Sequence, residues 1–345
     1  MKEKIKVFGA PASPYTHKMI SILRYRHIAY EVFMGDASGR LNRLDGIEPP
    51  KPILLPTLLL KDDNGELKAT TDTTPIIRRF ENEYADRKLL PEDPALSFIN
   101  YLLEDFGDEW VTKYMFHYRW YFDEDADNAS TILPLGDLAV NLSDDFLKEA
   151  KKYIHDRQTG RLWVVGSNDI TADLIDASYK RFIKLMDGHL SVSKFLFGEK
   201  PSSADFAIYG QLTQLIGFDP TSRKIAYENS LRLVSWLDVM ADLSGHDVDN
   251  SQWTSLEDSP DSLKAIMKEF GRVYVPALLE NAKAIMEGQD TWETEIDGSM
   301  WKQKAFPYQA KCLKWIKEEF NSLSHDDQSR VREFLHGTGC EVILG

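Results

Sequence analysis

Residues 5–14 read IKVFGAPASP, and this stretch decides the fold of the first part of the chain. Its apolar beginning predicts a short strand over residues 5–10, which the glycine and the first proline bring to an end. Ser13 and Pro14 then favour the start of a helix, because a serine can cap the first turn and a proline fits its first position. The sequence therefore predicts a strand, a turn and a helix in this order.

The residues that follow complete a small α/β domain. A second strand is predicted at residues 29–33, and the separation of about 20 residues suits a parallel pair joined by a helical crossover. After a loop rich in Gly, Asp and Pro, strands at residues 54–60 and 66–70 are predicted to form an antiparallel hairpin. A helix capped by residues 71–73 follows. We expect this domain to occupy residues 1–85.

Beyond a linker at residues 86–96, the apolar residues recur with the helical period. We therefore expect an all-helical domain at residues 96–245, which makes the fold class α/β plus all-α. The clearest helix start in it is Ser202, which can cap a helix while the carboxylate of Asp205 reaches back to the backbone N–H of the cap.

The remaining residues, 246–345, are predicted to form a structured extension that packs on the helical domain. It should contain a helix at residues 261–287, a hairpin with an Asp-Gly turn at residues 297–298, and a helix that begins near Tyr308. The two-residue turn would bring two pairs of side chains face to face across the strands, Thr294 with Trp301 and Glu293 with Lys302.

Composition excludes several classes of protein. The chain holds 41 Lys and Arg against 55 Asp and Glu, and this net charge of −14 opposes attraction to nucleic acid or to an anionic membrane surface. No apolar run approaches the roughly 20 residues of a membrane span. The two cysteines, Cys312 and Cys340, and the scattered histidines lack metal-ligand spacing, and the N-terminus lacks a secretory signal. We expect a soluble, cytoplasmic protein with no metal, nucleic-acid or membrane partner.

Four features, taken together, resemble the glutathione transferase family. They are the turn before the first helix, Pro56 at the head of the third strand, the pair Asp72-Thr73 before the third helix, and Phe-Leu-Phe-Gly at residues 195–198 before the capping box. The resemblance covers roughly residues 1–240, and the tail is similar to that of long bacterial members. It implies a thioredoxin-like glutathione-binding domain, a helical C-terminal domain and a homodimer.

The resemblance implies that the thiol of glutathione lies at the N-terminus of the first helix, beside Ser13. A hydroxyl that donates to the sulfur, together with the positive end of a helix, favours the thiolate and so makes a nucleophile. Tyr15 and Thr16 are alternatives if the helix starts later. Phe8 stands where some classes carry a catalytic tyrosine, and no cysteine replaces Ser13, so the chain resembles the serine type. The other interpretation of Ser13 is a plain helix cap.

The resemblance also implies positions for the rest of glutathione. Pro56 matches a cis-proline whose preceding residue, Leu55, offers its backbone to the cysteinyl part of the tripeptide. Asp72 and Thr73 match the pair that holds the γ-glutamyl end, although family members more often carry Glu-Ser. The Lys or Gln that often precedes the proline is absent. Three cations could bind the glycyl carboxylate instead: Lys51, Lys18 and Arg43.

An aromatic stripe in residues 110–121 is a candidate acceptor pocket. Its members share one helical face: Trp110, Tyr114, His117, Tyr118 and Tyr121. Such stripes also form cores and dimer interfaces, and a histidine among them is commonly a hydrogen-bonded core residue. Both interpretations remain open at this point.

These observations favour a glutathione transferase that activates the thiolate of its co-substrate for attack on a small hydrophobic electrophile, as in detoxification. The sequence names neither the electrophile nor the reaction. A non-catalytic binding or scaffold protein with the same fold is the first alternative. A glutathione-dependent oxidoreductase is the second, and the absence of an N-terminal cysteine argues against it.

Overall fold

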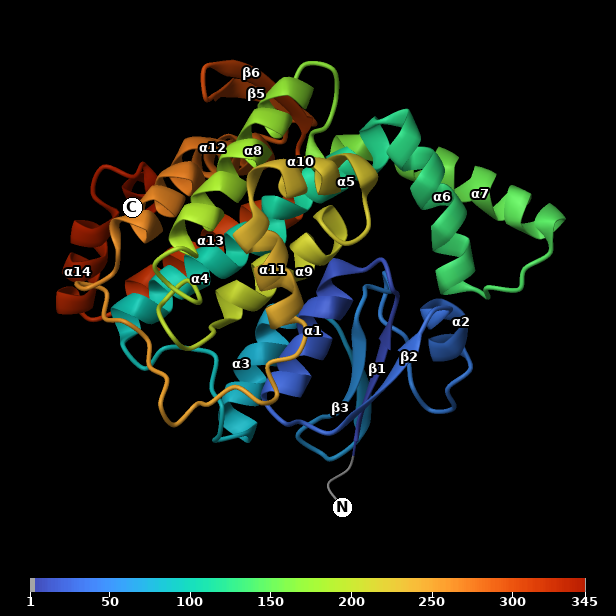
Figure 1. The fold of residues 1–345 in the computed structure, drawn as a ribbon, viewed down its shortest axis with the longest axis horizontal. Coiled ribbons are helices and arrows are strands. Elements are labelled where there is room, and N and C mark those ends of the chain that lie inside the picture. The colour runs from blue at the N-terminus through green and yellow to red at the C-terminus, as the bar shows by residue number, and fades with distance from the viewer. Residues whose placement is uncertain (1–3, 345) are drawn as a thin grey trace.

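The computed structural model describes residues 4–344, whose arrangement Figure 1 shows. A four-stranded sheet has the order β2, β1, β3, β4. The strands are β1 (Ile5–Gly9), β2 (Tyr30–Met34), β3 (Thr57–Lys61) and β4 (Leu67–Thr70). β1 runs parallel to β2 and antiparallel to β3, and β3 runs antiparallel to β4. The predicted parallel crossover and the predicted hairpin are both confirmed.

The third strand begins later than predicted, at Thr57 instead of residue 54. Pro56 has no N–H to contribute to a strand ladder, so pairing cannot include it as a donor. The Thr57 hydroxyl donates to the carbonyl of Leu54 at 2.7 Å and ties the preceding residues into a bend.

Helices cover both faces of this sheet. They are α1 (Pro14–Tyr25), α2 (Ala37–Asn42) and α3 (Thr73–Glu83). α1 and α3 pack on the face that joins the main core, whereas α2 covers the opposite face, where Leu41 packs with Phe8. The sequence predicted only a loop at α2. Asp36 caps this short helix by accepting a hydrogen bond from the backbone N–H of Gly39 at 3.1 Å.

The helical region follows the sheet. Its helices are α4 (Pro94–Glu109), α5 (Val111–Tyr121), α6 (Asp123–Asp137), α7 (Asp144–Thr159), η1 (Leu162–Val165), α8 (Ala172–His189), α9 (Ser203–Leu215), α10 (Pro220–Asn229) and α11 (Leu231–Met240). α9 packs against α1, α4 and α5, so it joins the sheet domain to the helices. The predicted capping box at its start is confirmed, because Asp205 accepts from the Ser202 backbone N–H at 2.9 Å. The pair α6 and α7 extends to one side in Figure 1.

The rest of the chain folds back over the helices. It comprises α12 (Asp261–Met286), β5 (Thr291–Ile296), β6 (Ser299–Lys304), α13 (Pro307–Ser322), α14 (His325–Leu335) and η2 (Cys340–Leu344). The hairpin register pairs Thr294 with Trp301 and Glu293 with Lys302, as predicted. Two helices follow the hairpin instead of the single predicted one, because Ser324 caps a new start. In residues 4–344 no helix is both long and apolar enough to cross a bilayer.

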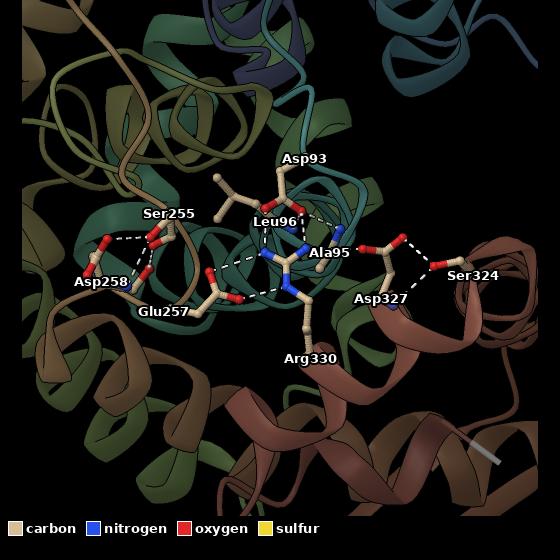
Figure 2. Close-up of polar contacts among 10 residues, drawn as sticks. Asp93, Ala95, Leu96, Ser255, Glu257, Asp258, Ser324, Asp327 and Arg330 are labelled. Atoms are coloured by element: carbon tan, nitrogen blue, oxygen red, sulfur yellow. Dashed lines mark hydrogen bonds and ion pairs between the residues drawn. The ribbon is translucent and has the colours of Figure 1, made fainter.

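Arg330, near the end of the chain, binds residues at the start of the helical region, as Figure 2 shows. Arg330 on α14 donates to both carboxylate oxygens of Asp93, at 2.5 and 3.0 Å, and Asp93 is the N-cap of α4. The same guanidinium donates to Glu257 at 2.7 Å. Because a bidentate arginine fixes both distance and orientation, this contact holds α14 in place against the start of α4.

Candidate functional site

Three segments meet at one edge of the sheet. The last residues of β1 and β4 pair with the first residues of β3: Phe8 with Thr57, and Thr70 with Leu58. Three segments therefore lie at the same ends of neighbouring strands. They are the segment from β1 to Ser13, the bend at Pro56 that leads into β3, and the segment from β4 to Asp72. The candidate residues of the glutathione site are brought together by this register.

Ser13 is the N-cap of α1, and its Oγ accepts a hydrogen bond from the backbone N–H of Thr16 at 3.2 Å. The residue keeps 8% of its surface exposed. Its hydroxyl proton is donated to no acceptor in residues 4–344. A serine can accept with a lone pair and donate with its proton at the same time, so capping the helix leaves the hydroxyl free to donate to a ligand.

The two alternatives to Ser13 are already engaged. The Tyr15 hydroxyl donates to the backbone carbonyl of Asp108 at 2.7 Å. Burial, followed by the negative charges of Glu109 and Asp108, raises the pKa of Tyr15 well above its usual value. Thr16 is fully buried, and its hydroxyl accepts from the Ala10 backbone N–H at 3.4 Å.

Leu55 offers an unused stretch of backbone. The peptide bond between Leu55 and Pro56 is cis. Neither the N–H nor the carbonyl of Leu55 makes a hydrogen bond within the described part of the chain. This donor and acceptor can pair with the backbone of an extended ligand that lies beside Leu55.

Asp72 is the N-cap of α3, and its Oδ1 accepts from the Thr74 backbone N–H at 3.3 Å. Its φ of 74° lies in a region that L-residues other than glycine enter at a cost of about 1–3 kcal/mol. The conformation is thus held by its surroundings, and it presents a carboxylate at the positive end of a helix.

The C-terminal extension, residues 246–345, contacts the Asp72 carboxylate. The hydroxyl of Tyr308, at the start of α13, donates to the second oxygen of Asp72 at 3.2 Å. Thr73 next to it accepts from the Lys18 ammonium, also at 3.2 Å. The Tyr308 contact was not predicted from the sequence, since nothing local to residue 308 indicates a partner 236 positions earlier in the chain.

The three cations proposed for the glycyl carboxylate lie in different environments. Lys18 is fully buried and pairs with Asp108 at 2.6 Å and Glu104 at 2.9 Å. Burial alone would lower the pKa of Lys18, but these two carboxylates outweigh it and raise the pKa above its usual value. Arg43 pairs with Asp36 at 2.9 Å. Lys51 has a highly exposed side chain and only a loose contact, so it is the most available of the three.

Acidic residues of α4 lie behind the site, and they were not predicted from the sequence as part of it. Burial, with the neighbouring carboxylates, raises the pKa of Asp105 to about 7 and that of Glu109 to about 8. The pKa of Asp108 is raised as well, again mainly by burial. The available signal was four acids, residues 104, 105, 108 and 109, in an otherwise apolar helix.

The aromatic stripe of α5 is part of the core. Trp110, Tyr114, His117 and Tyr118 are fully buried. The Trp110 indole donates to the Tyr114 hydroxyl at 2.8 Å, and the Tyr118 hydroxyl donates to Asp176 at 2.6 Å. Burial lowers the pKa of His117 to about 4. None of these four side chains lines the surface cavity of about 650 Å³ that lies beside Phe218.

The mixed sheet has α1 and α3 on one face and α2 on the other, and a large helical region follows it. This arrangement defines a thioredoxin-like domain joined to a helical domain. Residues 7–88 match the family described as "Glutathione S-transferase, N-terminal domain". The sheet domain is therefore similar to the N-terminal domain of glutathione transferases. No curated protein matches the sequence.

Several solved structures are similar to this chain. A GST-like protein from Pseudomonas syringae has 16% identity and a TM-score of 0.42, over 69% of this chain and 66% of that one. A glutathione transferase family member from Pseudomonas fluorescens, with two glutathione bound, has 14% identity and a TM-score of 0.43, over 69% and 88%. FzlA from C. crescentus has 12% identity and a TM-score of 0.41, over 77% and 92%. The likeness to the family in sequence lies in residues 7–88.

Proposed function

We propose that this chain binds glutathione at the edge of the sheet and transfers it, through its thiolate sulfur, to a small hydrophobic electrophile. The observation that carries the proposal is the unused backbone of Leu55, which lies at the same edge as Ser13 and Asp72. A tripeptide can pair with this backbone as an added strand. Its ammonium would meet the Asp72 carboxylate, and its α-carboxylate would meet the N-terminus of α3. Lys51 is the candidate partner of the glycyl carboxylate.

In this proposal Ser13 donates its free proton to the sulfur. The hydroxyl already sits at the N-terminus of α1, where the helix end carries a partial positive charge. Both effects lower the free energy of the thiolate relative to the thiol, so the sulfur becomes nucleophilic near neutral pH. The reactions open to such a thiolate are conjugation, halide displacement, ether cleavage and double-bond isomerisation.

A non-catalytic binding protein is the second candidate, and one contact favours it. Tyr308 already occupies one oxygen of Asp72, so the extension competes with a ligand for part of the site. The oxidoreductase has less support, because Cys312 and Cys340 are both buried and burial raises the pKa of each thiol.

Substitution of Ser13 separates the first two functions. We expect Ser13→Ala to keep glutathione binding in calorimetry and to lose most of the turnover of chlorodinitrobenzene. Ser143→Ala is the matched control, since Ser143 caps α7 through the same kind of bond, to Phe146 at 3.3 Å, and lies outside the site. Glutathione binding without turnover in the wild type would favour the binding protein, and equal turnover in both variants would remove Ser13 from the mechanism.

The homodimer remains a prediction. α13 and α14 both pack against α4, so the extension covers a face of the helical region that a second chain could otherwise use. Light scattering of the purified chain measures the mass directly, and the mass of two chains is the expected result.

A further inference from the structure

The turn between β1 and α1 presents Ser13, and its first two carbonyl groups are bound by donors from the same segment. The Ala10 carbonyl accepts from the Ser13 backbone N–H at 3.1 Å. The Pro11 carbonyl accepts from Nε2 of His17, on α1, at 2.7 Å. A carbonyl oxygen has no proton to give, so this ring nitrogen is the donor. Both contacts are local to residues 10–17.

The third carbonyl of the turn, that of Ala12, is bound from the helical region. Nη1 of Arg119, on α5, donates to it at 3.2 Å. The Ala12 carbonyl and the Ser13 N–H belong to one planar peptide group. Both polar groups of this peptide are therefore held, the N–H by Ala10 and the carbonyl by Arg119. Arg119 thus fixes the peptide plane that directly precedes the side chain of Ser13.

Arg119 is itself held firmly. The residue is 3% exposed, and its guanidinium donates to both carboxylate oxygens of Asp219, at 2.8 and 3.0 Å. It also donates to the side-chain oxygen of Gln214 at 2.8 Å, and the centre of the Phe218 ring lies 4.5 Å from its central carbon. A bidentate pair fixes the plane of a guanidinium. The Ala12 carbonyl therefore meets a donor whose position is set by α9 and the start of α10.

Two carboxylates face this guanidinium. Asp219 is the N-cap of α10, and Asp137 lies at the end of α6. Burial raises the pKa of each to about 6, and the positive charge of Arg119 opposes both shifts. Both carboxyls are mainly ionised at pH 7, so Arg119 is not an unpaired cation beside the turn. Its effect on Ser13 is one of geometry.

The first turn of α1 is also confined by α9. A Cβ added to Gly210 would lie 2.7 Å from the Pro14 carbonyl oxygen, closer than Cβ atoms approach in proteins. Gly210 and Gln214 are one helical turn apart on α9, so one face of this helix contacts both the start of α1 and Arg119. The start of α1 therefore has no room to move toward α9 if the Ala12 carbonyl is displaced.

We infer that Arg119 is a positioning residue for the activation of the glutathione thiol, and that it acts through the peptide group between Ala12 and Ser13. The inference rests on the proposed function, in which Ser13 donates its proton to the sulfur. The guanidinium does not touch the tripeptide. It keeps the Ser13 hydroxyl and the first N–H groups of α1 at the distance and angle that favour the thiolate. A purely structural role would instead lower stability and leave the thiol unchanged.

The test combines Arg119→Lys with Ser13→Ala in the full chain. Lysine keeps the charge beside Asp219, but it lacks the planar fork that reaches Asp219 and Ala12 at once. We expect Arg119→Lys to keep glutathione affinity in calorimetry within about twofold and to lower turnover of chlorodinitrobenzene by about 10- to 100-fold. The pKa of the bound thiol, measured from the ultraviolet absorbance of the thiolate, should rise by about 1 unit. In the Ser13→Ala background the same substitution should change turnover by less than about twofold, since Arg119 acts through Ser13.

Arg26→Lys is the matched control. Arg26 is also 3% exposed, forms an ion pair with Glu81 and donates to the Tyr84 carbonyl at 2.6 Å. It is the C-cap of α1, at the opposite end of the helix from Ser13. Its substitution should lower stability and leave the thiol pKa and the turnover unchanged.

Arg119→Met combined with Asp219→Asn is a second variant, needed if Arg119→Lys does not fold. Removal of both partners leaves no unpaired buried charge, which a protein tolerates better than the loss of one partner. This variant should raise the thiol pKa in the same way.

The remaining outcomes overturn the inference. Unchanged thiol pKa and turnover in the Arg119 variants, with a loss in Ser13→Ala, would reduce Arg119 to packing and leave the proposed function in place. Losses that add to that of Ser13→Ala would show that Arg119 does not act through Ser13. Weaker glutathione binding with an unchanged thiol pKa would contradict a positioning role. A wild type that does not turn over the electrophile would remove the proposed function and the inference with it.

Discussion

Replacement of Lys18 by methionine tests how much the buried ion pairs of this lysine stabilise the interior beneath the candidate site. The Lys18 side chain is fully buried, and its ammonium lies 2.6 Å from Asp108 and 2.9 Å from Glu104. It also donates to Thr73 at 3.2 Å, so it ties α1 to both α3 and α4. Methionine has a similar volume and no charge, so the substitution removes the cation and leaves the packing nearly unchanged.

The expected loss follows from the charges left behind. Two buried carboxylates would remain without their cation, and breaking a buried ion pair from one side costs about 3–5 kcal/mol. Domains unfold with a free energy of about 5–15 kcal/mol, so such a loss is a large share of the total. We expect Lys18→Met to lower the free energy of unfolding by roughly 3–5 kcal/mol at pH 7.

The loss should depend on pH. Burial alone would raise the pKa of Glu104, but Lys18 and Ser203 hold it below its usual value. A lowered folded pKa contributes stability that is present above the unfolded pKa, near 4.3, and is lost as the pH falls through the folded pKa. In the variant, Glu104 and Asp108 can take up protons instead of remaining charged. The deficit should therefore be largest near pH 7–8 and should shrink toward pH 5.

Urea unfolding between pH 5 and pH 8 measures this deficit. Lys113→Met is the matched control, because Lys113 is also buried but makes no ion pair within residues 4–344, and burial lowers its pKa to about 7. Removal of this lysine should change the free energy of unfolding by less than about 1 kcal/mol at pH 7, or raise it. Equal losses in the two variants, or a Lys18→Met deficit that does not vary with pH, would refute the reasoning.

Three further substitutions have defined outcomes. Tyr308→Phe removes the hydrogen bond to Asp72 and should raise glutathione affinity by about 2- to 10-fold in calorimetry, the equivalent of about 0.5–1.5 kcal/mol; weaker binding would instead make the hydroxyl part of the site. Arg330→Ala should lower the free energy of unfolding by about 1 kcal/mol and speed hydrogen exchange in α14, and unchanged exchange there would contradict the role given to this contact. Asp205→Ala leaves the buried N–H groups of Leu196 and Ser202 unpaired and should cost at least about 2 kcal/mol in urea unfolding; a smaller loss would mean that water replaces the carboxylate.

Local signals predicted much of the fold. The β3–β4 hairpin, the caps at Ser13 and Asp72, the capping box at Ser202 and the register of the β5–β6 hairpin all follow from a few neighbouring residues. Each of these features is fixed within one turn or one hairpin. Backbone hydrogen bonds and side-chain caps at that range are determined by residue type alone.

Features that depend on distant partners could not be predicted in this way. The contact between Tyr308 and Asp72 joins residues far apart in the sequence, and burial of the α4 acids appears only when α13 packs over them. Helix α2 lies where the sequence predicts a loop, because its six residues include a glycine and carry a weak periodic pattern. The spacing of the aromatic residues correctly predicted helix α5, but this spacing could not distinguish a helix face in the core from a helix face that lines a pocket.

Calorimetric titration of glutathione into the wild type and into Asp72→Asn tests the central claim most directly. The account predicts one glutathione bound per chain. It also predicts a loss of affinity of about 10- to 100-fold in the variant, because a charged hydrogen bond of about 1.5–3 kcal/mol is removed. Absence of glutathione binding to the wild type, or equal affinity in the two proteins, would contradict the assignment of this sheet edge as the glutathione site.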